Sequence, residues 1–270
     1  MNPFLLSALL ASFLASISSG IMGSFIVIKK ISSIAGSIAH SILGGIGFFL
    51  FLNYKYNLTF LRPIYGAFLA ALMSAFLIGF THLKYKQKED AVIAAIWSTG
   101  MAIGIIFISL INNYNVDFST YLFGNILFAE KSDIYMLLTF DIIIAIATFL
   151  FYQKFLVICF DEDLSFLKKL PTKSLYFFLL ALIAISIVLL IQIVGIILVI
   201  ALLIIPPTIA SNFVEKLSHV IYLSIILCCF FNFSGIMFSY GFNFPPGATI
   251  AITAGIFYFL QLFINKRKAI

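Results

Sequence analysis

The sequence predicts an all-α protein, a polytopic helical bundle that crosses a lipid bilayer about eight or nine times. Hydrophobic residues make up 63% of its 270 residues and charged residues only 10%, whereas a water-soluble domain usually has about 25% charged residues. Apolar stretches of about 20 residues, the length that spans a bilayer, follow one another along the whole chain. The segments between them are short, so we expect one transmembrane domain over residues 1–270.

The expected spans follow in order from the runs of apolar residues. The first has no basic residues before it and is too long for the apolar core of a signal peptide. The stretch 174–207 is either one long helix or two short helices that turn near residues 192–195. The expected spans are 4–28, 34–54, 59–81, 91–111, 134–152, 174–191, 193–207, 219–240 and 246–265.

Basic residues orient these spans. Thirteen of the 16 Lys and Arg residues fall on one side of the predicted bundle, and three, Lys55, Arg62 and Lys131, fall on the other. The excess marks the first side as cytoplasmic, which places the N-terminus outside and the C-terminus inside. The stretch 174–207 must then leave the cytoplasmic side and return to it, which favours two short helices or a re-entrant pair. Topology therefore accounts for the net charge of +6, and no nucleic-acid partner is expected.

His40 is the first candidate functional residue. It lies ten residues beyond Lys30, about 15 Å along a helix and close to the bilayer midplane. Ser33, Gly36, Ser37, Ser41 and Gly44 recur around it at helical spacing, so we expect a small, polar face that lines a translocation pathway. A neutral imidazole binds transition metals well. The alternative is a packing face with a hydrogen-bonded histidine.

Asp141 is the other ionisable residue expected inside the hydrocarbon. Its carboxylate is either an oxygen ligand for a metal or a structural acid bonded to hydroxyls of a neighbouring helix. His82 and His219 flank basic loops, and Cys159, Cys228 and Cys229 have no metal-ligand spacing. The sequence offers no arrangement of residues typical of a catalytic site.

The segment of residues 206–219, PPTIASNFVEKLSH, follows the seventh expected span. Two prolines are expected to stop that helix on the cytoplasmic side. The residues after them form either a short helix along the membrane, suited to docking a soluble partner, or a plain connecting loop.

Six segments in order resemble the permease family of bacterial ATP-driven importers of zinc, manganese and iron. They are GSFIVIKKISSIAGSIAHSILGG (23–45), EDAVIAAIWSTGMAIGI (89–105), VDFSTYLFGNIL (116–127), FDEDLSFLKKLPTKSL (160–175), VGIILVIALLIIPPTIA (194–210) and PPGATIAI (245–252). The resemblance covers nearly the whole chain. It implies a permease subunit in the bacterial inner membrane that moves a divalent metal ion into the cytoplasm and holds no permanent cofactor.

The resemblance also implies partners and residue roles. The partners would be a second permease copy or paralogue, cytoplasmic subunits that hydrolyse ATP, and an extracytoplasmic metal-binding protein, so this chain itself would not be an enzyme. His40 would be a metal ligand. The coupling element that contacts the ATPase would lie within 206–219 and include Pro207, Ser211, Asn212, Glu215 and Lys216.

One position departs from the family pattern. Many members have Asp four residues before the histidine, where this chain has Gly36. The two-ligand site on one helix is therefore absent. Either the His40 side chains of two protomers meet at a dimer axis, or Asp141 supplies the missing oxygen ligand. The sequence does not choose between zinc, manganese and iron as the transported metal. The alternatives to a permease subunit are a secondary transporter or channel driven by an ion gradient and a membrane-embedded enzyme.

Overall fold

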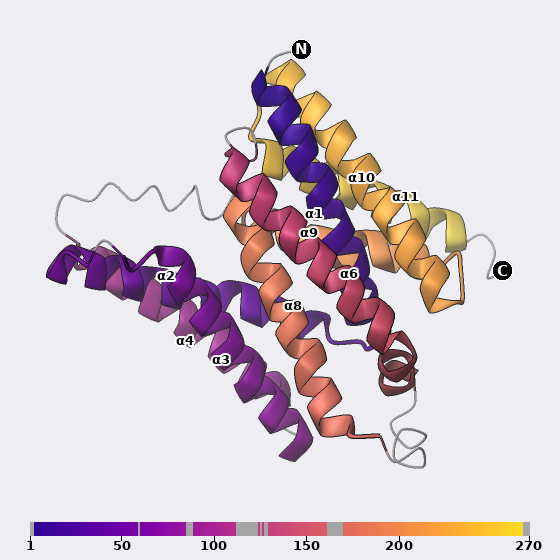
Figure 1. The fold of residues 1–270 in the computed structure, drawn as a ribbon. Helices are drawn as coiled ribbons and strands as arrows, with labels where there is room; N and C mark the ends of the chain where they lie inside the picture. The colour runs from indigo at the N-terminus through magenta and orange to yellow at the C-terminus, as the bar shows by residue number, and fades with distance from the viewer. Residues whose placement is uncertain are drawn as a thin grey trace. The chain divides into compact units, whose positions relative to one another are not determined.

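The computed structural model describes residues 3–58, 60–84, 89–111, 124, 126, 129–160 and 170–266. All regular structure in these ranges is helical (Figure 1). Eight of the helices are long and apolar enough to cross a membrane, and α9 is a shorter apolar helix. The helices are α1 (Pro3–Ile28), α2 (Ser32–Tyr56), α3 (Pro63–Lys84), α4 (Glu89–Ser109), α6 (Lys131–Phe160), α8 (Thr172–Val194), α9 (Ile196–Ser211), α10 (Leu217–Phe242) and α11 (Pro246–Lys266). The predicted fold class is confirmed.

The chain divides into two compact units, which are described separately. Unit 1 comprises Met1–Lys30, Ser119–Tyr152 and Ile193–Ile270, and unit 2 comprises Ile31–Phe118 and Gln153–Gln192. Unit 1 therefore contains α1, α9, α10, α11 and most of α6. Unit 2 contains α2, α3, α4, the end of α6 and most of α8.

In unit 1, α1 packs against α9 and α10, and α11 packs against the same two helices. Polar side chains join these helices where lipid offers no partner. The Asn232 amide on α10 donates to the Ser16 hydroxyl of α1 at 2.8 Å and to the Ser12 carbonyl at 3.1 Å. The Gln261 amide of α11 donates to the Ile209 carbonyl of α9 at 3.4 Å. Such hydrogen bonds add to the close packing that holds membrane helices together.

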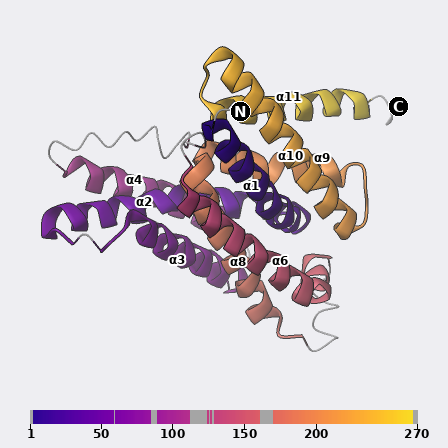
Figure 2. The ribbon, with the colours of Figure 1, turned by 45° about the horizontal axis from the view of Figure 1, so that its top comes forward.

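In unit 2, α2 packs along both α3 and α4, and the three helices lie side by side in both ribbon views (Figures 1 and 2). Glycines permit the close approach. A Cβ added at Gly44 would lie 2.7 Å from the Gly100 carbonyl oxygen, and one added at Gly47 would lie 2.6 Å from the Gly104 carbonyl oxygen. The backbones of α2 and α4 are thus in contact over a full turn, as small residues allow in membranes.

A break at Gly195 separates α8 from α9. Gly195 has a φ of 79°, a conformation that glycine adopts without steric cost. Gly124, which also has a positive φ, packs against the backbone of Val194 and Gly195, where a Cβ would clash. The prediction of two helices that turn near residues 192–195 is confirmed, and the apolar stretch is not one long helix.

The expectation that the prolines stop a helix is wrong. Pro206 and Pro207 lie inside α9, which runs on to Ser211. They remove the bonds that the Leu202 and Leu203 carbonyls would otherwise accept. The Cys228 thiol of α10 donates to the Leu202 carbonyl at 3.7 Å, and α1 packs on the Leu203 carbonyl at Gly23. Neighbouring helices therefore cover the freed carbonyls and α9 continues.

The predicted end of the fifth span at residue 152 is also too early, because α6 continues to Phe160. Gln153 and Lys154 follow the predicted end, and both are exposed. A lysine at a membrane interface keeps its charge in water and does not interrupt the helix.

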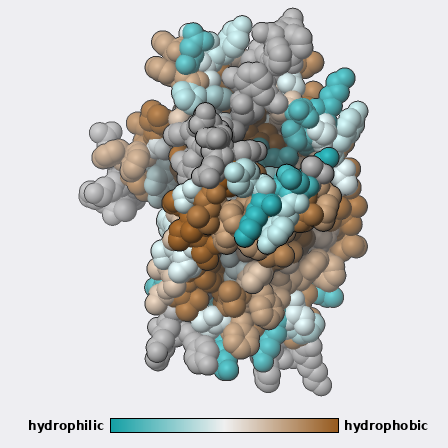
Figure 3. Space-filling model, turned by 90° about the vertical axis from the view of Figure 1, so that its left-hand side faces the viewer, coloured by the Kyte–Doolittle hydropathy of each residue, from teal (hydrophilic) through white to brown (hydrophobic). Residues whose placement is uncertain are grey.

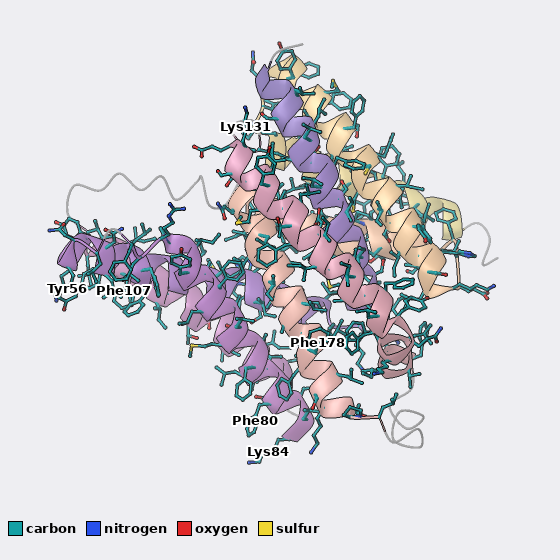
Figure 4. The ribbon with its side chains drawn as sticks, in the orientation of Figure 1. Tyr56, Phe80, Lys84, Phe107, Lys131 and Phe178 are labelled. Atoms are coloured by element: carbon teal, nitrogen blue, oxygen red, sulfur yellow. The ribbon has the colours of Figure 1, made fainter. Side chains whose placement is uncertain are left out.

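The outer surface of the helices is apolar. Phe149 of α6 is 83% exposed and Phe263 of α11 is 72% exposed, and brown hydrophobic residues cover much of the face drawn in Figure 3. Tyr56 and Phe107 lie together at one end of α2 and α4, whereas Phe80 and Lys84 lie at the C-terminal end of α3 (Figure 4). The Lys84 ammonium lies 5.4 Å from the Phe80 ring centroid. Aromatic and lysine side chains of this kind mark the two membrane interfaces.

Candidate functional site

The candidate site is the face of α2 that holds His40. α2 is 25 residues long, and His40 lies eight residues after its first residue, Ser32. At 1.5 Å per residue the imidazole is about 12 Å from the start of the helix. Most of α2 is buried around it, whereas His40 itself is half-buried. The imidazole therefore lies, half-buried, well inside a helix that is long and apolar enough to cross a membrane.

The imidazole of His40 stacks on the indole of Trp97 from α4. The ring centroids are 4.4 Å apart and the planes differ by 9°. The Nδ1 atom of His40 is buried and has no hydrogen-bond partner among the described residues. The alternative of a hydrogen-bonded packing histidine therefore finds no support at this nitrogen.

Ser37 and Ser41 are occupied by helix packing. The Ser37 hydroxyl donates to the Ile93 carbonyl of α4 at 2.9 Å. The Ser74 hydroxyl of α3 donates to the Ser41 hydroxyl at 2.7 Å, and Ser41 donates to the Ile38 carbonyl of its own helix at 2.8 Å. Gly44 contacts the backbone of α4. These three residues fix the positions of α3 and α4 around α2.

Ser33 and Gly36 differ from these three. Ser33 is exposed, and a Cβ built on Gly36 meets no atom of the described residues within 4 Å, although Gly36 itself is buried. Among these residues, the turn of α2 just before His40 thus has open space beside it. A side chain at residue 36 would enter that space without displacing a neighbour.

Asp141 belongs to unit 1, and His40 belongs to unit 2. Asp141 lies on α6, is 5% exposed, and has a buried Oδ2 atom without a hydrogen-bond partner among the described residues. Ser18 of α1 is the polar group beside the carboxyl. Within the part of the chain that the structure describes, no three His, Cys, Asp or Glu residues form a group that would hold a metal.

The connection between α9 and α10 consists of residues 212–216, so the short helix considered from the sequence does not form there. Ser211 ends α9, and the backbone amide of Phe213 donates to the Ala210 carbonyl at 3.0 Å. Asn212, Glu215 and Lys216 are exposed, and the Phe213 ring is 63% exposed among them. Pro207 lies inside α9. The connection thus presents one aromatic ring within a polar turn.

Sequence reasoning missed Trp97, the only tryptophan of the chain. The signal was present in the spacing of Ile93, Trp97, Gly100 and Gly104, which recur every three or four residues on α4. That spacing marks one helix face, but it does not name the helix that the face contacts. The contact of Trp97 with His40 required the structure.

Comparison with known proteins gives consistent matches over the full length. The model of the ABC 3 transport family matches residues 1–265. A probable metal transport system membrane protein of Chlamydia trachomatis serovar D is 45% identical over 264 residues, which cover 98% of this chain and 90% of that protein. The manganese transport system membrane protein MntC of Listeria monocytogenes is 34% identical over 276 residues, covering 99% of this chain and 96% of that protein.

A solved structure is also similar. PsaBC from Streptococcus pneumoniae in complex with a Fab aligns with a TM-score of 0.84 and 28% identity. The alignment covers 98% of this chain and 92% of that one.

Proposed function

This chain belongs to the ABC 3 transport family and is the membrane permease of a metal-ion ABC importer, and from that premise we propose that it passes a divalent transition-metal ion to the cytoplasm by way of His40. It is a multi-pass protein of the bacterial inner membrane. The observation that carries the proposal is a half-buried imidazole at membrane depth, beside empty space. Ionisable groups inside a membrane are costly, and they mark ion pathways by default.

His40 is proposed as the metal ligand because its nitrogen chemistry and its surroundings fit that role. The Nδ1 atom has no hydrogen-bond partner among the described residues, so coordination of a cation by this imidazole would break no bond of the protein. A neutral imidazole binds zinc, manganese and iron. We propose that the ion moves along the face of α2 that holds Ser33, Gly36 and His40. Ser37, Ser41 and Gly44 would support this pathway by holding α3 and α4 in place.

Manganese is the first candidate for the transported metal. The relative from Listeria monocytogenes is described as part of a manganese transport system. Carboxylate, carbonyl and water oxygens are the ligands that suit manganese, whereas imidazole is the more usual ligand of zinc and iron. We propose that the chain accepts manganese through one imidazole and oxygen atoms, including the oxygens of water. Zinc and iron are the alternatives that an uptake assay separates.

Asp141 is proposed as an oxygen donor to the metal, because its carboxyl is buried and one of its oxygens has no hydrogen-bond partner among the described residues. The test is Asp141→Asn, which keeps the shape and removes the charge. We expect the change to lower metal uptake. Uptake at the wild-type level would leave Asp141 as a structural acid beside Ser18.

The partners proposed for the permease are a second permease copy or paralogue, cytoplasmic ATP-binding subunits and an extracytoplasmic metal-binding protein. ATP hydrolysis would take place on the ATP-binding subunits. We propose residues 206–219 as the segment that contacts them, with Ser211, Asn212, Glu215 and Lys216 around the exposed ring of Phe213. Pro207 would serve this contact indirectly, because it lies inside α9 just before the turn.

The decisive experiment is metal uptake by the assembled importer with His40→Ala. We expect uptake of radioactive manganese to fall at least about tenfold, the scale at which metal sites lose activity when a supporting group is removed. His82→Ala is the matched control, because His82 lies at the end of α3 and its ring packs on Tyr176. Equal uptake by the two variants would contradict the assignment of His40.

An ion-gradient transporter is not favoured by the family match. The same uptake assay distinguishes an ATP-driven importer from a transporter driven by an ion gradient. Transport by an importer requires the ATP-binding subunits and stops when their hydrolysis is blocked. Transport that continues without them would refute the proposed importer.

A further inference from the structure

We propose that Trp97 is the positioning residue for His40, and that its indole holds the imidazole in the orientation that receives the metal ion. This inference rests on the proposed role of His40 as a ligand. It goes beyond that role by naming the residue on which the orientation of the ligand depends. It also makes the only tryptophan of the chain a reporter of metal at the site.

The first argument is the geometry of the two rings. Their centroids are 4.4 Å apart and their planes are within 9° of parallel. Aromatic pairs at this separation attract each other by about 0.5–1.5 kcal/mol beyond the area that they bury. The contact restricts rotation of the imidazole, because a tilt of the ring would drive its edge into the indole.

The second argument is that the two helices cannot easily separate at this point. One turn before the stack, the Ser37 hydroxyl donates to the Ile93 carbonyl at 2.9 Å. One turn after it, Gly44 lies against the Gly100 carbonyl, 2.7 Å from where a Cβ would be. The stack is therefore held between two contacts of α2 with the backbone of α4. Trp97 keeps its place although it is 42% exposed.

The third argument is what His40 lacks. A histidine that binds metal almost always donates its other ring nitrogen to a carboxylate, a carbonyl or water, and this bond fixes the ring. The buried Nδ1 of His40 has no such partner among the described residues. The face of the indole is the remaining restraint on the ring.

The geometry also predicts a change in the fluorescence of Trp97 when a metal ion binds to His40. The two ring centroids are 4.4 Å apart. When the metal–nitrogen bond of about 2.1 Å is added to the distance from the imidazole centroid to its nitrogen, an ion bound to His40 lies about 5–6 Å from the indole centroid. An ion with unpaired d electrons, such as Co²⁺, quenches indole fluorescence at this range. Emission from Trp97 should therefore fall when Co²⁺ occupies the site.

The experiment uses the full-length permease in lipid vesicles. Co²⁺ is added to the wild-type protein and to His40→Ala while Trp97 emission is recorded. Binding of Mn²⁺ to the wild type, His40→Ala, Trp97→Phe and Trp97→Leu is measured by the electron paramagnetic resonance signal of the free ion. Phe107→Leu is the matched control, because it removes another aromatic ring of α4 that packs on α2, 5.1 Å from Phe48.

We expect Co²⁺ to quench the wild type but not His40→Ala. Trp97→Leu should weaken Mn²⁺ binding about tenfold, as the loss of a supporting group does, whereas Trp97→Phe and Phe107→Leu should bind nearly as the wild type does. Thermal unfolding of each variant shows whether it is folded. The quenching measurement requires no change at Trp97, so it tests the placement of the ion beside the indole even if Trp97→Leu fails to fold.

The outcomes separate the two proposals. Wild-type Mn²⁺ affinity in His40→Ala would refute the ligand role of His40 and, with it, the inference. If His40→Ala loses affinity while folded Trp97→Leu keeps it, only the role of Trp97 is overturned. Absence of quenching in a wild type that binds Co²⁺ would likewise overturn the placement of the ion beside the indole.

Discussion

Introducing a carboxylate one turn before His40, with Gly36→Asp, should convert a one-ligand site into a two-ligand site. Within the described part of the chain, a Cβ at Gly36 meets no atom within 4 Å, so the side chain has room. Residues four apart on a helix have Cβ atoms about 5–6 Å apart. Metal–oxygen and metal–nitrogen bonds are each about 2 Å long, so both side chains can reach one ion.

The expected gain in Mn²⁺ affinity is at least about tenfold, which corresponds to about 1.4 kcal/mol. A second ligand brings one more negative charge to the cation, but the carboxylate must lose water on entering a buried turn. The gain should depend on His40. A double-mutant cycle of Gly36→Asp with His40→Ala should give a coupling energy of about 0.5–3 kcal/mol, as for other residues in contact.

The assay is Mn²⁺ binding to the purified permease, followed by the signal of the free ion. Gly36→Asn is the matched control, since it has the same shape and a much weaker metal ligand. The reasoning would be refuted if Gly36→Asp bound Mn²⁺ no better than Gly36→Asn. It would equally be refuted if the gain persisted in full without His40, because the carboxylate would then act elsewhere.

Four further substitutions test the packing and the coupling turn. Gly44→Ala should lower the free energy of unfolding by about 1–3 kcal/mol, because its Cβ would lie 2.7 Å from a backbone carbonyl of α4. Gly36→Ala should be neutral or stabilising by up to about 1 kcal/mol. Thermal unfolding in detergent compares the two variants. Gly124→Ala, at a φ of 67°, should destabilise by at least about 1 kcal/mol in the same assay, and a wild-type midpoint would contradict its contact with the α8–α9 break. Phe213→Ala should reduce metal-stimulated ATP hydrolysis in the assembled importer while Mn²⁺ binding stays unchanged, and full stimulation would exclude this ring from the coupling contact.

The sequence predicted the helices well because each must be about 20 apolar residues long to cross the bilayer. It predicted the break near Gly195, since the basic residues required the chain to turn back. It was less accurate at helix ends. Pro206 and Pro207 do not end α9, because carbonyl groups freed by proline are covered by α1 and α10. No local pattern reports that a neighbouring helix will supply those contacts.

Only part of the candidate site could be predicted from the sequence. His40 was identifiable because an ionisable residue in an apolar helix is expensive. The roles of its neighbours were not identifiable, because Ser37 and Gly44 are small residues that suit the lining of a pathway and close packing on α4 equally well. Only the contacts with Ile93 and Gly100 distinguish packing from the open space beside Gly36.

By itself, the sequence determined that this protein is a transmembrane bundle of helices and that a single imidazole lies on its second helix. These features follow from the length, hydropathy and charge of segments taken one at a time. The tertiary structure alone decided that α4 presents Trp97 to His40 and that α9 continues through two prolines. Both depend on residues that are far apart along the chain and meet only when the helices pack: Trp97 and His40 on α4 and α2, and Cys228 and Leu202, which are 26 positions apart.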